Sequence, residues 1–114
     1  MKRVLLTLFL LSPPLFAQTT YTCVGPVTDL VVSPNGVVTA SIGSLAWVYL
    51  CAIGTTSNYN GVTSDACKAI YAHLLSAKTT GAQETFWFND SLTCTTHPAW
   101  ANLTGWYFGP DFQQ

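Results

Sequence analysis

The sequence predicts a small, mainly β domain (α+β) that carries one helix and two disulfide bonds. Three observations support this prediction: the chain has 114 residues, it contains four cysteines, and several segments are rich in β-branched and aromatic residues. This length allows one domain. An even number of cysteines in a short chain is typical of a disulfide framework formed in an oxidising compartment. Charged residues make up only 8% of the chain, which excludes a charged disordered tail.

The first 17 residues have the pattern of a secretory signal peptide. Lys2 and Arg3 form a basic start, residues 4–11 are apolar apart from one threonine, and Ala17 is a small residue suited to cleavage. A membrane helix is the alternative, but it needs about 18 uninterrupted apolar residues. The longest later apolar stretch, residues 45–53, is much shorter. We therefore expect secretion to the periplasm or the cell exterior, no membrane insertion, and a single mature domain at residues 18–114.

The first three strands are expected in the first half of the mature chain. Residues 27–32 and 37–42 are rich in valine and flank a turn at 33–36. The proline of this turn suits its first corner, and the Asn-Gly pair tolerates the positive φ that closes a hairpin. Residues 45–53 follow and are apolar on both faces, which is typical of a central strand covered on both sides.

A helix is predicted at residues 64–78, after a polar loop at 54–61. Thr63 or Ser64 supplies the N-cap, Asp65 lies in the first turn, and Gly81 provides a C-terminal stop. Apolar residues recur at spacings of three and four and form one face, made of Cys67, Ile70, Tyr71, Leu74 and Leu75.

Two further strands are predicted after the helix. Residues 83–89 and 105–108 are aromatic-rich, residues 89–100 form the loop between them, and the Gly-Pro pair at 109–110 is expected to end the last strand. The element order is therefore β-β-β-α-β-β. In a chain this short, that order fits an OB-fold, a five-stranded barrel with one helix between strands three and four.

The cysteines suggest one pairing, although four cysteines allow three connectivities. Cys67 lies on the predicted buried face of the helix, so a bridge to Cys51 on the third strand is geometrically reasonable, and Cys23 would then pair with Cys94. No Cys-x-x-Cys motif is present, and neither histidine has metal-ligand spacing to a cysteine. We therefore expect structural disulfides and no metal site.

The chain resembles the subtilase cytotoxin B subunit family in three places. Residues 64–81 with 86–88 resemble its helix, Thr-Gly turn and aromatic strand. Residues 108–111, Phe-Gly-Pro-Asp, resemble its tail, and residues 25–36 resemble its first hairpin. The resemblance implies an OB-fold, assembly as a homopentamer, binding of cell-surface glycans, and a separate catalytic A subunit as partner. It transfers no sugar-contacting residue to this sequence.

Two places in the sequence combine an aromatic ring with a nearby side-chain amide. Tyr59 follows Asn58, and Trp100 precedes Asn102 by two residues. An aromatic ring can stack on the apolar face of a sugar, while amides bind its hydroxyl groups. These four residues are therefore candidate ligand-binding residues. In the alternative interpretation the aromatic residues are structural: Trp100 packs against a disulfide or a neighbouring subunit, and the core contains Trp47, Tyr49, Tyr71 and Trp87.

No catalytic site and no cofactor are expected. His73 is predicted to be exposed on the helix and His97 to be solvated in a loop, while Glu84 and Asp90 are expected at opposite ends of one strand. Without the signal peptide, two lysines face five acidic residues, too few cations for a nucleic-acid groove. We therefore expect a secreted, non-catalytic glycan-binding protein. The alternative is a structural or protein-interaction module without sugar affinity.

Overall fold

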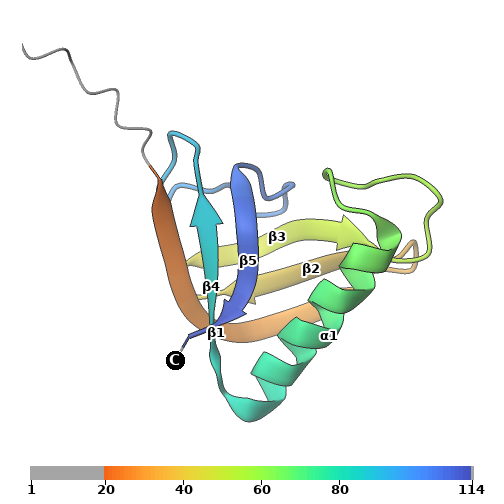
Figure 1. Cartoon of the computed structure of the whole chain (residues 1–114), viewed down its shortest axis with the longest axis horizontal. Coiled ribbons are helices and arrows are strands. Elements are labelled where there is room, and N and C mark those ends of the chain that lie inside the picture. Colours follow the sequence, from red (N-terminus) through yellow and green to blue (C-terminus); the bar gives the residue numbers. More distant parts are fainter. Residues whose placement is uncertain (1–19, 114) are drawn as a thin grey trace, which may run out of the picture.

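A computed structural model of the chain describes residues 20–113 (Figure 1). The predicted signal peptide lies outside these described residues. Five strands form one antiparallel sheet in the order β3-β2-β1-β4-β5, and one helix lies between β3 and β4 in the sequence. The predicted mainly β fold with this element order is confirmed. The elements are β1 (Tyr21–Val32), β2 (Val37–Ile42), β3 (Leu45–Ala52), α1 (Ser64–Thr80), β4 (Gln83–Phe88) and β5 (Trp106–Phe112).

The sheet bends sharply within β1. Residues 21–26 of this strand pair with β4, whereas residues 27–32 pair with β2, so that β4 and β5 cross β2 and β3 in Figure 1. A Cβ atom at Gly25 would lie 2.3 Å from the Cα atom of Gly43, so the bend depends on a glycine at this position. The strand therefore begins at Tyr21 and not at residue 27, because Gly25 and Pro26 bend the strand instead of ending it.

The sheet is not closed by strand pairing, and β3 and β5 are its two edges. The prediction that β3 is a central strand was therefore wrong. Val48 and Leu50 face the core, whereas Trp47 and Tyr49 point to the other face and are partly exposed. Residues 45–53 looked apolar on both faces in the sequence, because aromatic side chains occupy the outer face of β3.

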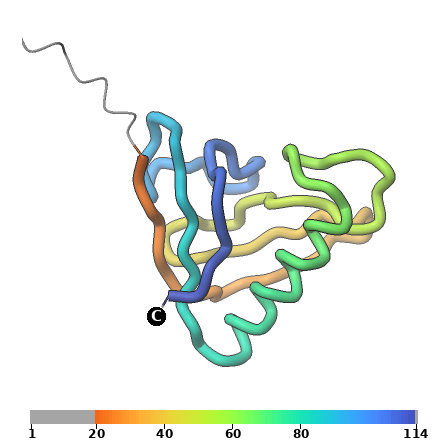
Figure 2. The backbone as a smooth tube through the Cα atoms, in the orientation of Figure 1, coloured from red at the N-terminus to blue at the C-terminus, as the bar shows by residue number. Residues whose placement is uncertain are grey.

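The free edge of β3 contacts the loop that joins β4 to β5. The Tyr49 N–H donates to the Ala101 carbonyl at 2.9 Å, and the Leu103 N–H donates to the Tyr49 carbonyl at 2.9 Å. These bonds form an isolated parallel bridge between Tyr49 and Asn102. Figure 2 shows this connection, residues 89–105, passing from the end of β4 toward β3 before β5 begins.

Helix α1 has the predicted caps. The Thr63 hydroxyl accepts from the Ala66 N–H at 3.1 Å, and Gly81 ends the helix with φ 74°. Cys67, Leu74 and Ala77 are its buried residues. Leu75 was expected on the buried face, but it is 44% exposed, because the contact stripe continues from Leu74 to Ala77 on the next turn.

Two disulfides join the pairs named from the sequence. Cys51–Cys67 links β3 to α1, and Cys23–Cys94 links β1 to the loop at residues 89–105. Disulfides of this kind are typical of extracellular or periplasmic proteins. Among the described residues, α1 is too short and too polar to cross a membrane.

Strand β5 continues past the point where the sequence predicted its end. The Gly109–Pro110 peptide is cis, and pairing with β4 resumes at Asp111 and Phe112. The register between β4 and β5 shifts here, with the extra residues on β5. Inside the bend, both halves of the sheet and the helix share one core, whose largest members are Ile42, Leu45, Leu50, Leu74, Phe86, Phe88 and Leu103.

Candidate functional site

A shallow groove with two tyrosines lies on the outer face of β2 and β3. Its volume is about 300 Å³, which is at the low end of the ~300–1,000 Å³ range of small-molecule sites. Thr39 and Tyr49 face each other across the β2–β3 pair, and Ser33 and Asn35 come from the β1–β2 turn. We call this surface the tyrosine groove; it is lined by Ser33, Asn35, Val37, Thr39, Tyr49 and Tyr59. None of these six residues carries a charge at neutral pH.

Tyr59 reaches the groove through a tight turn that the sequence analysis left as an undivided loop. The backbones of Tyr59 and Val62 exchange hydrogen bonds of 3.1 and 2.9 Å. The residues between them, Asn60 and Gly61, have positive φ values of 53° and 73°, as a type I′ turn requires. The Asn60 amide also donates to the Leu103 carbonyl at 2.8 Å, which anchors the turn beside β3. The Asn-Gly pair was the signal in the sequence that could have identified this turn.

A pair of stacked tryptophans lies beside the groove, and we call it the tryptophan stack. The rings of Trp47 and Trp100 have centroids 4.9 Å apart and planes inclined by 8°. The Trp100 N–H donates to the Trp47 carbonyl at 2.8 Å, and the Trp47 N–H donates to Ser41 Oγ at 3.0 Å. Trp100 is nevertheless 60% exposed. This pair was not anticipated, because 53 residues separate its members in the sequence.

Both tryptophans have left-handed backbone conformations. Their φ values are 50° and 57°, in a region that bulky side chains rarely occupy. Such a conformation costs about 1–3 kcal/mol per residue and persists where the surrounding contacts enforce it. The two backbone hydrogen bonds and the pairing of Tyr49 with residues 101–103 supply these contacts. Outliers of this type occur at ligand-binding sites more often than elsewhere.

The structure brings only part of the predicted ligand-binding set together. Tyr59 lines the tyrosine groove, and Trp100 forms the tryptophan stack. Asn102 is exposed and lies next to Tyr49 through the isolated bridge. Asn58 instead lines a separate polar hollow of about 470 Å³, together with Asp65 and Lys68 at the start of α1.

The four aromatic residues assigned to the core by the structural interpretation divide into two groups. Trp47 and Tyr49 form the outer surface just described. Tyr71 packs against the core from α1, and Trp87 on β4 contacts Phe108 with ring centroids 5.3 Å apart. Trp100 packs on Trp47 and not on a disulfide.

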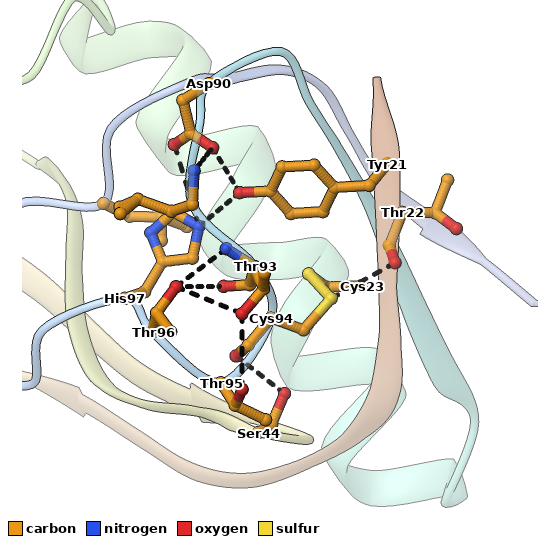
Figure 3. A network of polar contacts seen from close by, with 12 residues as sticks. Tyr21, Thr22, Cys23, Ser44, Asp90, Thr93, Cys94, Thr95, Thr96 and His97 are labelled. Atoms are coloured by element: carbon orange, nitrogen blue, oxygen red, sulfur yellow. Dashed lines mark hydrogen bonds and ion pairs between the residues drawn. A yellow bond between two sulfur atoms is a disulfide. The ribbon is translucent and has the colours of Figure 1, made fainter. Parts of the chain in front are cut away.

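A second polar cluster lies near the start of β1 and contains Tyr21, Asp90 and His97 (Figure 3). The Tyr21 hydroxyl donates to Asp90 Oδ1 and lies 2.8 Å from His97 Nε2. Because the Tyr21 proton is directed at Asp90, its oxygen can accept a hydrogen bond from His97, and we assign the Nε2–H tautomer to His97. Asp90 Oδ1 also accepts from the Leu92 N–H at 3.1 Å, which ties the loop after β4 to the cluster.

The pKa values in this cluster favour the neutral forms of the tyrosine and the histidine. Burial raises the pKa of Tyr21, and the hydrogen bond to Asp90 raises it further. Burial lowers the pKa of His97, and the negative charge of Asp90 offsets part of this effect. The prediction that His97 is solvated was wrong, because its side chain is only 1% exposed. His97 belongs to the loop at residues 89–105, and its ring packs against that of Phe88, with centroids 4.6 Å apart and planes inclined by 43°.

A third polar contact joins α1 to β4. His73 Nε2 lies 2.9 Å from Glu84 Oε2, and Glu84 is fully buried. Burial raises the pKa of Glu84, and the contact with His73 partly offsets this rise. His73 was expected to be an exposed helical residue, but its side chain is only 26% exposed, because Phe112 stacks on its ring at a centroid distance of 3.9 Å and Glu84 contacts its Nε2. Glu84 and Asp90 belong to separate clusters, in agreement with their expected separation along the strand.

The chain was also compared with known proteins. No family model, curated protein or solved structure matches it. The geometry of the described residues therefore carries the functional argument.

Proposed function

We propose that this protein is a secreted, non-catalytic carbohydrate-binding protein whose binding site is the tyrosine groove. The observation that carries the proposal is the composition of this groove. Two phenol rings, from Tyr49 and Tyr59, share a depression with hydroxyl and amide side chains of Ser33, Asn35 and Thr39. A sugar has an apolar face that stacks on aromatic rings and an edge of hydroxyl groups that bind such polar side chains.

We further propose that the domain is an OB-like barrel of the type found in toxin B subunits. The order β-β-β-α-β-β supports this proposal. The parallel bridge between Tyr49 and Asn102 also supports this proposal. It brings the segment before β5 alongside β3, and a closed barrel requires the two edges of the sheet, β3 and β5, to meet. By the same resemblance we propose a homopentamer that delivers a separate catalytic subunit.

Binding is favoured over catalysis by the location of the acid–base residues. Tyr21, Asp90 and His97 are residue types used in proton transfer. A general base must contact its substrate, yet the His97 side chain is only 1% exposed and is already engaged by Tyr21. The cluster is suited to hold the loop at residues 89–105 in place, which in turn positions Trp100.

The test is a glycan array probed with the oxidised protein lacking residues 1–17, together with its mass in solution. Selective binding of one sugar class is the expected result. The variant Tyr59→Ala should reduce this binding by about tenfold, as expected for an aromatic residue that anchors a ligand. Leu75→Ala is the control, because Leu75 is 44% exposed on α1, outside the groove and outside the exposed apolar residues of β1 and β5. Equal binding by the wild type and Tyr59→Ala would contradict the assignment of the groove.

The second candidate function is a protein-interaction module, and a different surface favours it. Three large apolar side chains on β1 and β5 are exposed, namely Val24, Tyr107 and Phe108. Clusters of exposed apolar residues are typical of protein interfaces. If the protein binds no glycan and Phe108→Asp changes its mass in solution, this second function is supported. If a ring forms and also binds glycans, the same surface serves the proposed assembly.

A further inference from the structure

The tryptophan stack presents a free aromatic face to solvent. One face of the Trp100 ring is covered by Trp47 at 4.9 Å, yet Trp100 remains 60% exposed, so its other face is open. An exposed indole held in a left-handed backbone conformation by specific hydrogen bonds is rigid and positioned in advance. Rigid aromatic platforms bind planar or ring-shaped ligands with little loss of side-chain entropy.

The tryptophan stack and the tyrosine groove lie on the same face of β3. Val48 and Leu50 are fully buried, so Tyr49, which alternates with them, points away from the core. The Trp47 N–H binds Ser41 Oγ, and Ser41 is on the same face of β2 as the groove residue Thr39. Thr39 in the groove and Ser41 at the tryptophan stack are two residues apart on β2, which corresponds to about 7 Å. This separation is on the scale of one pyranose unit. The loop that carries Trp100 is fixed to Tyr49 itself, through the bonds of Tyr49 with Ala101 and Leu103.

The side chains that form the combined surface are also uncharged. The six lining residues of the groove are uncharged, and so are Trp47, Trp100 and Asn102. Within residues 20–113, both lysines lie on α1, and Lys68 lines the separate hollow with Asn58. A carboxylate on the ligand would therefore lose its hydration at this surface without gaining a cation, which is unfavourable.

We propose that the outer face of β3 binds a neutral oligosaccharide of at least two units, with one unit in the tyrosine groove and the next stacked on Trp100. This inference rests on the proposed carbohydrate function and specifies its ligand class. It makes two claims that the groove alone does not make. The affinity depends on the length of the sugar chain, and an acidic sugar does not improve it.

The test is a calorimetric titration of the oxidised protein with matched sugar probes. The neutral pairs are glucose with maltotetraose, N-acetylglucosamine with chitotetraose, and galactose with lacto-N-neotetraose. The charged pair is lactose with 3′-sialyllactose. We expect one tetrasaccharide to bind about tenfold more tightly than its monosaccharide, which corresponds to about 1.4 kcal/mol, because its second unit stacks on Trp100. We expect 3′-sialyllactose to bind no better than lactose.

Two variants of Trp100 test whether this residue forms the second subsite, and one control variant changes an exposed residue outside the proposed binding surface. Trp100→Ala should reduce the affinity for the tetrasaccharide about tenfold and leave that for the monosaccharide unchanged. Trp100→Gly removes the same ring while tolerating the positive φ, so it remains informative if the alanine variant fails to fold. Leu75→Ala is the control, because Leu75 is 44% exposed on α1, belongs to neither the groove, the tryptophan stack nor the apolar surface of β1 and β5, and should affect neither affinity.

The outcomes separate the inference from the proposed function. If no probe binds, including 3′-sialyllactose, the carbohydrate function and the inference both fail. If a probe binds with equal affinity as monosaccharide and tetrasaccharide, or if the Trp100 variants retain the wild-type affinity, the function survives and the inference is overturned. Tighter binding of 3′-sialyllactose than of lactose would overturn the inference and leave the carbohydrate function standing.

Discussion

The two halves of the bent sheet place their polar chemistry in opposite positions. In the half formed by β4, β5 and the start of β1, two ionisable groups are inside: Glu84 is fully buried and the His97 side chain is 1% exposed. The second half is formed by β2, β3 and the two loop segments that carry Tyr59 and Trp100. Its candidate ligand-binding side chains, among them Tyr49, Tyr59 and Trp100, are uncharged and lie outside the core. We call these the β4–β5 half and the β2–β3 half.

The difference shows that residue type alone does not locate a functional site. The β4–β5 half contains the tyrosine, histidine and carboxylates that a search for catalysts would select. Their protons are directed at one another, and they fix the helix and a loop to the sheet. The β2–β3 half offers no ionisable group in its groove apart from the two phenols, but its side chains are accessible to a ligand. We therefore expect changes in the first half to alter stability and changes in the second half to alter binding.

The largest effect is expected from the disulfide that crosses between the halves. Replacing Cys23 and Cys94 together by serine should lower the free energy of unfolding by about 4 kcal/mol in the chain-entropy model, because 71 residues separate them. The same change at Cys51 and Cys67, which are separated by 16 residues, should cost about 3 kcal/mol. Urea denaturation of both variants measures the two losses. A smaller loss at Cys23–Cys94 than at Cys51–Cys67 would contradict the expected role of this bridge.

One chemical change, removal of a phenol hydroxyl, distinguishes the two halves directly. Tyr21→Phe leaves Asp90 and His97 without their shared partner and should cost about 1–3 kcal/mol of stability. Tyr59→Phe alters a surface hydroxyl and should change stability by less than about 0.5 kcal/mol. Thermal unfolding and glycan titration of both variants form the measurement. The proposed difference between the two halves would be contradicted if Tyr59→Phe were the more destabilising change. It would also be contradicted if Tyr21→Phe weakened glycan binding while the fold remained intact.

The pH dependence of stability provides a second test within the β4–β5 half, starting with His97. Its pKa is lowered in the folded state, so the unfolded chain binds a proton more readily. The stabilising contribution is present above the unfolded-state pKa, about 6.5, and is lost as the pH falls through the folded-state pKa. His97→Gln should flatten this decline in urea denaturation at a series of pH values. An unchanged slope would show that His97 is not the group responsible.

Glu84 should show the opposite sign. Its pKa is raised in the folded state, so its stabilising contribution is present below the unfolded-state value of about 4.3 and is lost as the pH rises through the folded-state pKa. The variant Glu84→Gln keeps the shape and cannot ionise. Its stability relative to the wild type should therefore increase with pH over that range. A constant difference between the two proteins would mean that burial does not raise the pKa of Glu84.

A smaller difference in stability is expected from the strained backbone of the β2–β3 half. Trp100→Gly should be about 1 kcal/mol more stable than Trp100→Ala, because glycine adopts a positive φ without a steric penalty. Thermal unfolding of the two variants gives this difference. If alanine is tolerated as well as glycine, the left-handed conformation at Trp100 is not strained.

Local signals in the sequence were sufficient for most of the fold. The β1–β2 turn forms as predicted, with Gly36 at φ 86° closing it, and the helix begins after Thr63 and ends at Gly81. Turn and cap preferences act over a few residues, so they are visible in the chain itself. The pairing of Cys51 with Cys67 followed from the same helix, because the periodicity of its apolar residues placed Cys67 on the buried side.

The features that the sequence did not reveal depend on contacts between distant residues. His73 meets Glu84, and His97 meets Tyr21, only after the sheet has bent, and this bend occurs at Gly25 and Pro26, which resemble a strand terminator. Half of the candidate site could nevertheless be predicted from the sequence, because side-chain amides near Tyr59 and Trp100 drew attention to these two residues. Their partners Tyr49 and Trp47 were assigned to the core, because an exposed aromatic face on an edge strand has the same composition as a buried strand.

The most direct test of the account is to locate bound sugar on the folded protein. Uniformly ¹⁵N-labelled, oxidised protein would be titrated with maltotetraose, chitotetraose and lacto-N-neotetraose while ¹H–¹⁵N correlation spectra are recorded. The account predicts that one sugar shifts the backbone amides of Thr39, Tyr49 and Tyr59 and the indole N–H signals of Trp47 and Trp100, while those of Trp87 and Trp106 stay in place. Shifts confined to Trp87 and β5, or spectra unchanged by all three sugars, would contradict the assignment of binding to the β2–β3 half.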